Sequence, residues 1–302
     1  IAVAGGTGGI GRAIVRACVA DGRKVVVLSR KSSAGSEQGA PVVQVDYTDT
    51  ALLEDALKSH QIGTVVSTLA VLTSNEAEIN LVSAAEASSC TKRFIPSSWG
   101  IAYTEEEGKL FPPAGLKLDV LSKLKKSNLE YTRVNCGFFL DYFGMPKIQS
   151  FLQPTTIVVD LNNNTAGIPG EGNTPVTFTH TTDVARYVSK ALDLPKWKPD
   201  SYTIGDKITW NDFVELAEKT KGVKFNVQHD SIETLQKGQI TELPAHVPVY
   251  PYFPKEQLQF VFSVFGLWFE GGAFNLHPGQ GSLDLNAEFP EIKPLTVKDV
   301  LQ

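Results

Sequence analysis

The sequence predicts a Rossmann-type α/β fold, with a doubly wound parallel sheet and a smaller C-terminal α+β domain. Short β-branched runs alternate with longer segments of helical periodicity through the first half of the chain, as in repeated βαβ units. The run 25–28 is apolar at every position, which is expected when helices cover both faces of a parallel sheet. The first run leads directly into a turn that is rich in glycine.

Six strands are expected to form the sheet, at 1–4, 24–28, 42–45, 64–69, 93–96 and 130–135. Helical segments are expected between most of them, at 10–20, 51–58, 76–87 and 117–126. The pattern then changes, because residues 162–174 are rich in Pro, Gly and Asn and predict a long connection between two further strands, at 157–159 and 176–179. We therefore place a first domain at 1–145 and a second at 146–302, with a helix at about 182–192 packing back on the first.

The composition excludes several classes of protein. The 302 residues carry a formal net charge of −5, without the basic stripe that would neutralise nucleic-acid phosphates. The longest apolar stretch, 260–269, is far shorter than the ~20 residues of a membrane helix. The three cysteines lie too far apart for a disulfide framework or a metal-ligand spacing, which favours a reducing, cytoplasmic location. Because the chain opens on a strand, we expect no signal peptide, only a few residues missing before Ile1.

The turn after the first strand has the composition of a phosphate-binding loop. It consists of Gly5-Gly6-Thr7-Gly8-Gly9-Ile10-Gly11, in which Gly5, Gly8 and Gly11 have a GxxGxxG spacing. Glycines let backbone N–H groups approach a pyrophosphate at the positive N-terminus of the next helix, and the last one lets this helix pack closely on the sheet. An ordinary tight turn is also glycine-rich, but here strand, loop, helix and second strand follow in order. We predict a dinucleotide site that includes Thr7, Gly9 and Ile10.

The end of the second strand predicts which nicotinamide cofactor binds. An acidic residue there would accept a hydrogen bond from the ribose 2′-hydroxyl of NAD. This chain has Ser29, Arg30, Lys31 and Ser32 instead. Arg30 can stack on adenine and pair with a 2′-phosphate, while Lys31 and the serines add donors. The expected cofactor is NADPH. Asp46, after the third strand, is expected to contact the adenine edge, with the start of the next turn as the alternative.

These residues and two further segments resemble the NmrA-like and isoflavone reductase-like proteins, which are atypical members of the short-chain dehydrogenase superfamily. The segments are Arg93-Phe94-Ile95-Pro96-Ser97-Ser98-Trp99-Gly100 and 129–139. The family pattern at the first is Arg-Phe-Leu/Ile-Pro-Ser-Glu-Phe-Gly, so Ser98 and Trp99 replace its Glu and Phe. The resemblance weakens further along, although 182–187 still fits. It implies a reductase that uses NADPH.

The resemblance also implies a catalytic residue, Lys117. Reductases of this family use a lysine about a dozen residues before a Pro-Tyr-Thr type motif, and counting back from Glu130-Tyr131-Thr132 gives Lys117. It would donate or relay a proton and would also lie against the cofactor. A single lysine is more often a solvated surface residue, so this assignment depends on the resemblance. The chain has no Tyr-x-x-x-Lys pair, the proton relay of the main short-chain dehydrogenases.

Residues near the carboxyl ends of the strands complete the predicted site. Those expected along the ribose and nicotinamide are Leu69, Ala70 and Ser97, and Asn135, at the end of the sixth strand, is expected to be a further cofactor-binding residue. An apolar pocket beside the nicotinamide is expected to be lined by Trp99, Tyr103, Phe138, Phe139, Phe143 and His180. Aromatic residues that would close it from the second domain are Phe262, Phe265, Trp268 and Phe269, although such residues are often core. Cys136 is expected to pack as a small hydrophobic residue.

Two functions stay open at this stage. The first is hydride transfer from NADPH to a conjugated C=C, a C=O or a benzylic carbon of a small aromatic or polyketide-like molecule, with Lys117 as proton donor. The second is an NmrA-like sensor that binds the dinucleotide without turnover and reports redox state to a protein partner. The fold and the glycine loop are common to both. A homodimer is also open.

Overall fold

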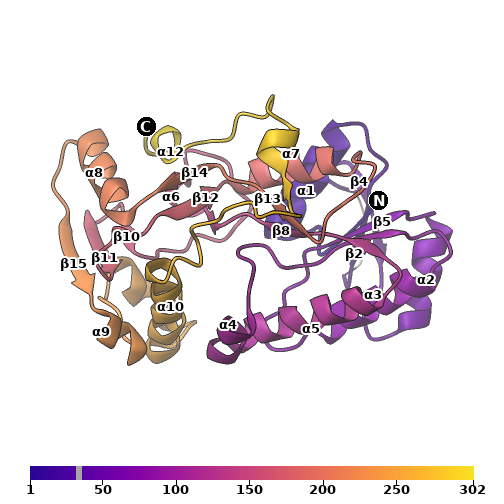
Figure 1. The fold of residues 1–302 in the computed structure, drawn as a ribbon, viewed down its shortest axis with the longest axis horizontal. Coiled ribbons are helices and arrows are strands. Elements are labelled where there is room, and N and C mark those ends of the chain that lie inside the picture. The colour runs from indigo at the N-terminus through magenta and orange to yellow at the C-terminus, as the bar shows by residue number, and fades with distance from the viewer. Residues whose placement is uncertain (32–35) are drawn as a thin grey trace.

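The computed structural model describes residues 1–31 and 36–302, in two parts that lie side by side along the longest axis (Figure 1). The N-terminal part contains a seven-stranded sheet in the order β3-β4-β2-β1-β5-β6-β7, with all neighbours parallel except β3 and β4. The strands are β1 (Ala2–Ala4), β2 (Val26–Ser29), β3 (Ser36–Glu37), β4 (Ala40–Gln44), β5 (Thr64–Ser67), β6 (Arg93–Ile95) and β7 (Glu130–Tyr131). The predicted doubly wound sheet is confirmed, and its strand order reverses between β1 and β5.

Helices cover both faces of this sheet. The side chains of Ala2 and Ala4 face a buried layer formed with α2, α3 and α5. Val3, which lies between them, faces the opposite layer, formed with α1 and α7. Because successive side chains of a strand point to opposite faces and both faces are buried, the strand is apolar at every position. The helices are α1 (Gly9–Ala20), α2 (Thr50–Ser59), α3 (Glu76–Ala87), α4 (Glu105–Leu110), α5 (Pro112–Lys126) and α7 (Thr181–Ala191).

Helix α7 comes from the second half of the chain but lies against α1. Val184 and Val188 of α7 belong to the same buried cluster as Ile14 of α1. At the end of α1, the Arg23 guanidinium donates to the Ser189 hydroxyl at 3.1 Å. The chain therefore crosses between the two parts more than once.

The predicted strand 130–135 is divided in the structure. Its first half, β7, stays in the large sheet, whereas β8 (Arg133–Asn135) pairs with β13 (Asp200–Tyr202), which also pairs with β16 (Leu283–Asp284). The break falls at Thr132, whose buried hydroxyl is 2.6 Å from the Ser201 hydroxyl. Hydrogen bonds to residues 200–202 redirect the strand. The local periodicity of a sequence cannot predict bonds to residues so far along the chain.

The predicted connection 162–174 is wrong, because it contains a strand. β11 (Thr165–Pro169) forms a hairpin with β10 (Val159–Asp160) and pairs on its other side with β15 (Asn226–Asp230). The turn between them is closed by Asn163, whose backbone and side-chain amides donate to the Asp160 carboxylate at 3.1 and 2.9 Å. The Asn-rich stretch is thus the hairpin turn, and the Gly and Pro after it lie in a short buried strand.

The rest of the C-terminal part packs around aromatic side chains. A third small sheet consists of β9 (Phe138–Phe139), β12 (Val176–Thr179) and β14 (Asp206–Ile208). Buried rings of Phe178, Trp210 and Phe213 lie within 5.2 to 5.7 Å of one another. Within residues 1–31 and 36–302, no helix is both long and apolar enough to cross a membrane. The remaining helices are α6 (Asp141–Gly144), α8 (Trp210–Lys221), α9 (Ile232–Gln236), η1 (Pro244–Val249), α10 (Lys255–Glu270), α11 (Leu285–Glu288) and α12 (Val297–Leu301).

We predict that Gly11→Ala destabilises the fold, whereas Gly63→Ala does not. A methyl group on Gly11 would lie 2.4 Å from the Thr68 hydroxyl oxygen and 2.6 Å from the Gly5 carbonyl oxygen, while one on Gly63 would have no atom within 4 Å. Overpacking of this kind costs about 1–3 kcal/mol of unfolding free energy. Chemical denaturation of both variants measures it, and equal midpoints for the two would contradict the prediction.

Candidate functional site

The glycine loop after β1 leaves the N-terminus of α1 open to solvent. Gly5 has φ of +76°, and its N–H donates to the Leu28 carbonyl at 3.1 Å, which turns the chain away from the sheet. Thr7 and Gly8 are exposed, and a methyl group on Gly8 would touch only the Gly5 carbonyl oxygen, at 3.8 Å. Among residues 1–31 and 36–302, no side chain caps α1, so the N–H groups of its first turn are available to an anion. Gly9 and Ile10 lie in this turn.

The predicted phosphate-selecting residues follow β2. Ser29 is half-buried, and its hydroxyl accepts from the Lys31 N–H at 3.2 Å. The side chains of Arg30 and Lys31 are exposed at the same edge of the sheet as the glycine loop. Ser32 lies outside the described residues. The two cations are therefore placed where a 2′-phosphate would lie in a Rossmann site.

Asp46 starts the next turn. Its carboxylate accepts from the Thr48 N–H at 2.8 Å and from the Thr48 hydroxyl at 2.7 Å. These hydrogen bonds hold the pKa of Asp46 below its ordinary value. Both bonds are local to the turn, as the alternative interpretation of Asp46 expects, and the adenine contact stays a prediction.

Ser97 connects the loops that follow β5 and β6. Its hydroxyl donates to the Leu69 carbonyl at 2.7 Å, and its N–H donates to the Glu78 carboxyl at 2.6 Å. Ala70, next to Leu69, is exposed. The three predicted ribose and nicotinamide residues, Leu69, Ala70 and Ser97, thus lie together at the carboxyl edge of the sheet.

Glu78 is a buried acid that sequence reasoning missed. It lies on α3 with 1% exposure, and burial raises the pKa of its carboxyl. An acidic residue on a helix ordinarily indicates a solvated face. The available signal was its position, since Glu78 stands three and four residues before Leu81 and Val82 on the buried stripe of α3.

Lys117 lies in a cavity of about 260 Å³ with aromatic walls. Its ammonium is 5.0 Å from the centroid of the Tyr103 ring, in cation–π geometry. The helix that carries it, α5, is tied to the start of α3, because the Asn75 amide donates to the Leu116 carbonyl at 3.0 Å. The cavity is lined by Val71, Leu72, Trp99, Gly100, Tyr103, Phe111, Pro113, Ala114, Lys117, Gly137, Phe138, Phe139, Tyr142, Val261, Phe265 and Phe274.

The structure brings together four of the six predicted pocket residues, Trp99, Tyr103, Phe138 and Phe139, and places the other two elsewhere. Phe143 is core, with its ring centroid 4.7 Å from that of Phe213. His180 is fully buried, where its Nδ1 accepts from the Thr182 N–H at 3.3 Å and caps α7. Packing partners from β12 and α8 place Phe143, and the sequence near it does not contain them, whereas His180 is held by its local bond to Thr182.

Of the four aromatic residues expected to close the pocket from the second half, only Phe265 lines it. Trp268 packs edge-on against Tyr103 and Phe111, at centroid distances of 5.7 and 5.6 Å. Phe269 is buried against Phe274 at 4.6 Å, and Phe262 packs on His246 at 5.5 Å. Of the aromatic residues predicted to close the pocket from the second half of the chain, Phe265 is therefore the one that does so.

Asn135 ends β8 and is fully buried. Its amide donates to the Asp200 carboxylate at 3.2 Å and the Ser201 carbonyl at 3.3 Å, so it anchors β13 to the sheet edge. Cys136 follows it and is also buried, which raises the pKa of its thiol to about 12. As predicted, this cysteine packs as a small hydrophobic residue.

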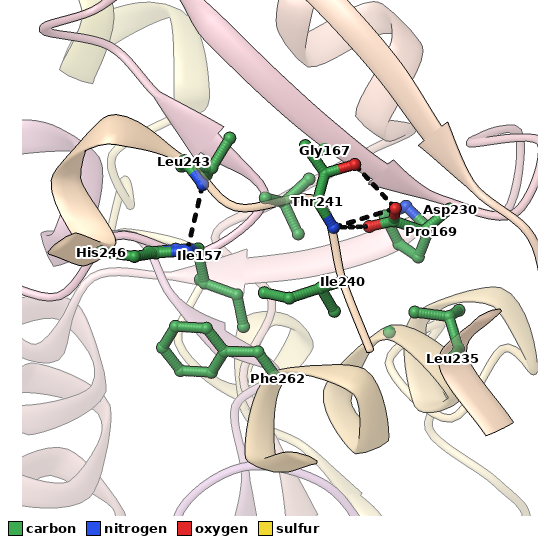
Figure 2. A pocket seen from close by; sticks show the side chains of 12 residues that line it. Ile157, Gly167, Pro169, Asp230, Leu235, Ile240, Thr241, Leu243, His246 and Phe262 are labelled. Atoms are coloured by element: carbon green, nitrogen blue, oxygen red, sulfur yellow. Dashed lines mark hydrogen bonds between the residues drawn. The ribbon is translucent and has the colours of Figure 1, made fainter. Parts of the chain in front are cut away.

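A second cavity lies in the C-terminal part, and Figure 2 shows its lining. Its free volume is about 10 Å³, which is room for about one water molecule. The polar groups there bond to each other: the Asp230 carboxylate accepts from the Thr241 N–H at 2.9 Å, and His246 accepts from the Leu243 N–H at 3.2 Å. This cavity is a packing feature of the fold.

The profile of the NmrA-like family matches residues 1–282. The chain belongs to the NmrA-like family. Oxidoreductase BOA1 of Botryotinia fuckeliana is 38% identical over 97% of this chain and 95% of its own length. The isoflavone reductase homolog IRL of Zea mays is 26% identical over 100% of this chain and 96% of its own length.

A solved structure has the same fold. The leucoanthocyanidin reductase of Vitis vinifera, in a binary complex with NADPH, superposes with a TM-score of 0.76 at 22% identity, covering 99% of this chain and 97% of its own. The resemblance to the NmrA-like and isoflavone reductase-like proteins is confirmed, as is the Rossmann-type fold. The match also extends through the C-terminal half of the chain, where the sequence offered no family landmark beyond Tyr187.

We predict that Glu78→Gln stabilises the protein increasingly as pH rises. Glutamine keeps an acceptor oxygen for the Ser97 N–H but cannot ionise. Because burial raises the pKa of Glu78 above its ordinary value of 4.5, wild-type stability is fully present below that value and declines as pH rises through the raised one. Thermal midpoints of both proteins from acid to mildly alkaline pH test this. The control is Glu86→Gln on the half-exposed face of α3, for which the difference should stay constant.

Proposed function

We propose that this chain is an NADPH-dependent reductase that transfers hydride to a conjugated C=C, a C=O or a benzylic carbon of a small aromatic or polyketide-like molecule. One observation carries the proposal: the ammonium of Lys117 lies in an aromatic cavity beside the loops that follow β5 and β6. The chain is an oxidoreductase by homology, since a relative that aligns with nearly the whole of this chain has that name. The reaction and the substrate class are what we add.

The residues at the sheet edge fit a dinucleotide phosphate. Gly5 and Gly11 pack so closely on Thr68 that the loop has one shape, while Gly8 leaves its outer face free for a pyrophosphate. Thr7, Gly9 and Ile10 would complete the contact with the phosphates. Arg30 and Lys31 supply the positive charge that a 2′-phosphate requires, and no acidic side chain follows β2 at this point. When bound, the reduced cofactor would supply the hydride.

The cavity suits a flat, largely apolar molecule. Its walls include Trp99, Phe138, Phe139 and Phe265, and its volume of about 260 Å³ is near the lower end for small-molecule sites. The Trp99 indole N–H donates to the Ser67 carbonyl at 3.1 Å, so this ring presents its apolar face rather than a donor. Aromatic substrates gain from offset and edge-on contacts with such rings.

Lys117 would act on the oxygen of the substrate. Hydride addition to a carbonyl or a conjugated system leaves negative charge on oxygen, and an ammonium nearby stabilises that charge and donates a proton. The apolar aromatic walls lower the local dielectric constant, which strengthens the interaction. Ser97 and Leu69 hold the loops in which the nicotinamide would lie, and the buried Glu78 fixes Ser97.

Arg30→Asp should reverse the cofactor preference. The substitution replaces attraction with repulsion at the 2′-phosphate, and we expect NADPH affinity to fall about 100-fold while NADH affinity changes little or rises. Fluorescence titration with each nucleotide measures this. Arg16→Asp, an exposed position on α1 whose guanidinium donates to the Gln149 side chain, serves as the matched control. Unaltered NADPH binding by Arg30→Asp would remove the assignment of the 2′-phosphate site.

Lys117→Met should abolish turnover without weakening the binding of NADPH. General acid catalysis contributes roughly 10²–10⁴-fold, so kcat should fall by at least about 100-fold while the Kd for NADPH stays within about twofold. NADPH consumption with a panel of aromatic enones, quinones and benzylic ethers provides the measurement. The control is Lys126→Met at the exposed end of the same helix. Tight NADPH binding with no turnover of any member by the wild type would instead favour a sensor of the bound dinucleotide.

A further inference from the structure

The cavity holds a tyrosine and a lysine in contact, although the sequence lacks the Tyr-x-x-x-Lys spacing. Tyr103 follows β6 and Lys117 lies on α5, yet the lysine ammonium is 5.0 Å from the centre of the tyrosine ring. An ammonium in an apolar cavity loses hydration, and the negative face of an aromatic ring compensates part of that loss. The ring of Tyr103 thus fixes the position of the charge.

The Tyr103 hydroxyl lies beside Gly100, another residue that lines the cavity. A methyl group built on Gly100 would be 3.3 Å from that hydroxyl oxygen. Gly100 is bridged to Asn135 at the end of β8, and its carbonyl accepts from the N–H groups of Cys136 and Gly137 at 2.8 and 2.9 Å. The hydroxyl is therefore next to the carboxyl edge of the sheet, on the side from which a nicotinamide would face the substrate.

The side chain and backbone of Tyr103 are held from several directions. Its ring meets the edge of Trp268 at a centroid distance of 5.7 Å. Its carbonyl accepts from the Arg133 guanidinium at 3.3 Å, and Arg133 in turn pairs with Asp200 at 2.6 Å. A donor fixed before the reaction needs no reorganisation when charge develops, which is the condition for strong stabilisation of an oxyanion.

We propose that Tyr103 is a second catalytic residue of the cavity and acts as a pair with Lys117. This inference rests on the proposed reductase function. The Tyr103 hydroxyl donates to the substrate oxygen, and the Lys117 ammonium stabilises the phenolate left behind.

When bound, NADPH would supply the hydride that forms the new C–H bond and would itself become NADP⁺. The oxygen of the substrate takes the proton of the Tyr103 hydroxyl, so the substrate gains one hydride and one proton, which together amount to two electrons and two protons. Tyr103 regains its proton from the Lys117 ammonium through water, because the ammonium lies over the ring rather than beside the oxygen, and Lys117 is then reprotonated from solvent.

Tyr142, the other tyrosine that lines the cavity, is less suited to this role. It lies on α6, and burial raises the pKa of its hydroxyl to about 12, so the hydroxyl keeps its proton. Its ring packs on Phe138 at a centroid distance of 5.4 Å and on Phe139 at 6.4 Å. Contact with a cationic partner distinguishes Tyr103 from it.

A phenol probe tests the pair without turnover. The probe is 4-nitrophenol, which is yellow as phenolate and colourless as phenol, mixed with the NADP⁺-saturated protein at a pH equal to the pKa of the free probe. We expect the wild type to bind it mainly as phenolate. Tyr103→Phe, which keeps the ring over Lys117 and removes the hydroxyl, should weaken phenolate binding about tenfold, the scale of a hydrogen bond to a charged group. Lys117→Met should abolish the phenolate band, and Tyr202→Phe on β13 should leave it unaltered.

The outcomes separate this inference from the proposed function. A wild-type protein that does not shift the probe toward phenolate overturns the pair, as does a Tyr103→Phe variant with the wild-type phenolate affinity and the wild-type kcat. Loss of kcat in Lys117→Met with no effect of Tyr103→Phe would leave the reductase standing without its second residue. A phenolate band that depends on both residues, in a protein that oxidises NADPH with none of the panel compounds, would leave a phenolate-binding pair but overturn both its catalytic role and the reductase. Tyr103→Leu removes ring and hydroxyl together, and it should bind phenolate more weakly than Tyr103→Phe.

Discussion

Thr68, the first residue after β5, holds the start of α1 against the sheet. Its N–H and its hydroxyl both donate to the Ala4 carbonyl, at 2.8 and 2.7 Å. Gly5 and Gly11 pack on it at distances where no Cβ atom fits. This contact joins β1, β5 and α1 at the point where the strand order reverses, which is where ligands bind in doubly wound sheets. The position of the helix N-terminus therefore depends on the Thr68 hydroxyl and on glycine at positions 5 and 11.

From this point to the cavity, buried and half-buried hydrogen bonds connect successive elements. Ser97 links the loops after β5 and β6, Glu78 holds Ser97 from α3, and Asn75 of α3 holds the backbone of α5 just before Lys117. Every link joins a different element, so the ammonium and the glycine loop are fixed relative to each other through the interior. A charged group that must meet a bound dinucleotide needs such a connection, because catalysis loses efficiency with small displacements.

The sequence predicted the parallel sheet and its glycine loop because both depend on local patterns. A strand buried on both faces must be apolar throughout, and a pyrophosphate site must lack side chains. Thr68 and the division of the strand at Thr132 could not be predicted, since each depends on a partner from elsewhere in the chain, whereas Glu78 could have been identified from its place on the buried stripe of α3. The aromatic residues of the sequence predicted the lining of the pocket only in part, because their positions also depend on partners from elsewhere in the chain. Phe138 lines the cavity while Phe143 is core, and only the packing of β12 and α8 distinguishes them.

The departure from the family pattern at Ser98 and Trp99 has a physical counterpart in the structure. Where the pattern has a Glu, this chain has a buried serine, and where it has a Phe, an indole that donates into the sheet at Ser67. A buried carboxyl still reaches this turn, but it comes from Glu78 of α3 and accepts from the Ser97 N–H. The turn thus retains a carboxyl contact through a different element. Trp99 lines the cavity together with Phe138 and Phe139 of β9, so the departure places an indole, where the family pattern has a phenyl ring, in the wall of the space that contains Lys117.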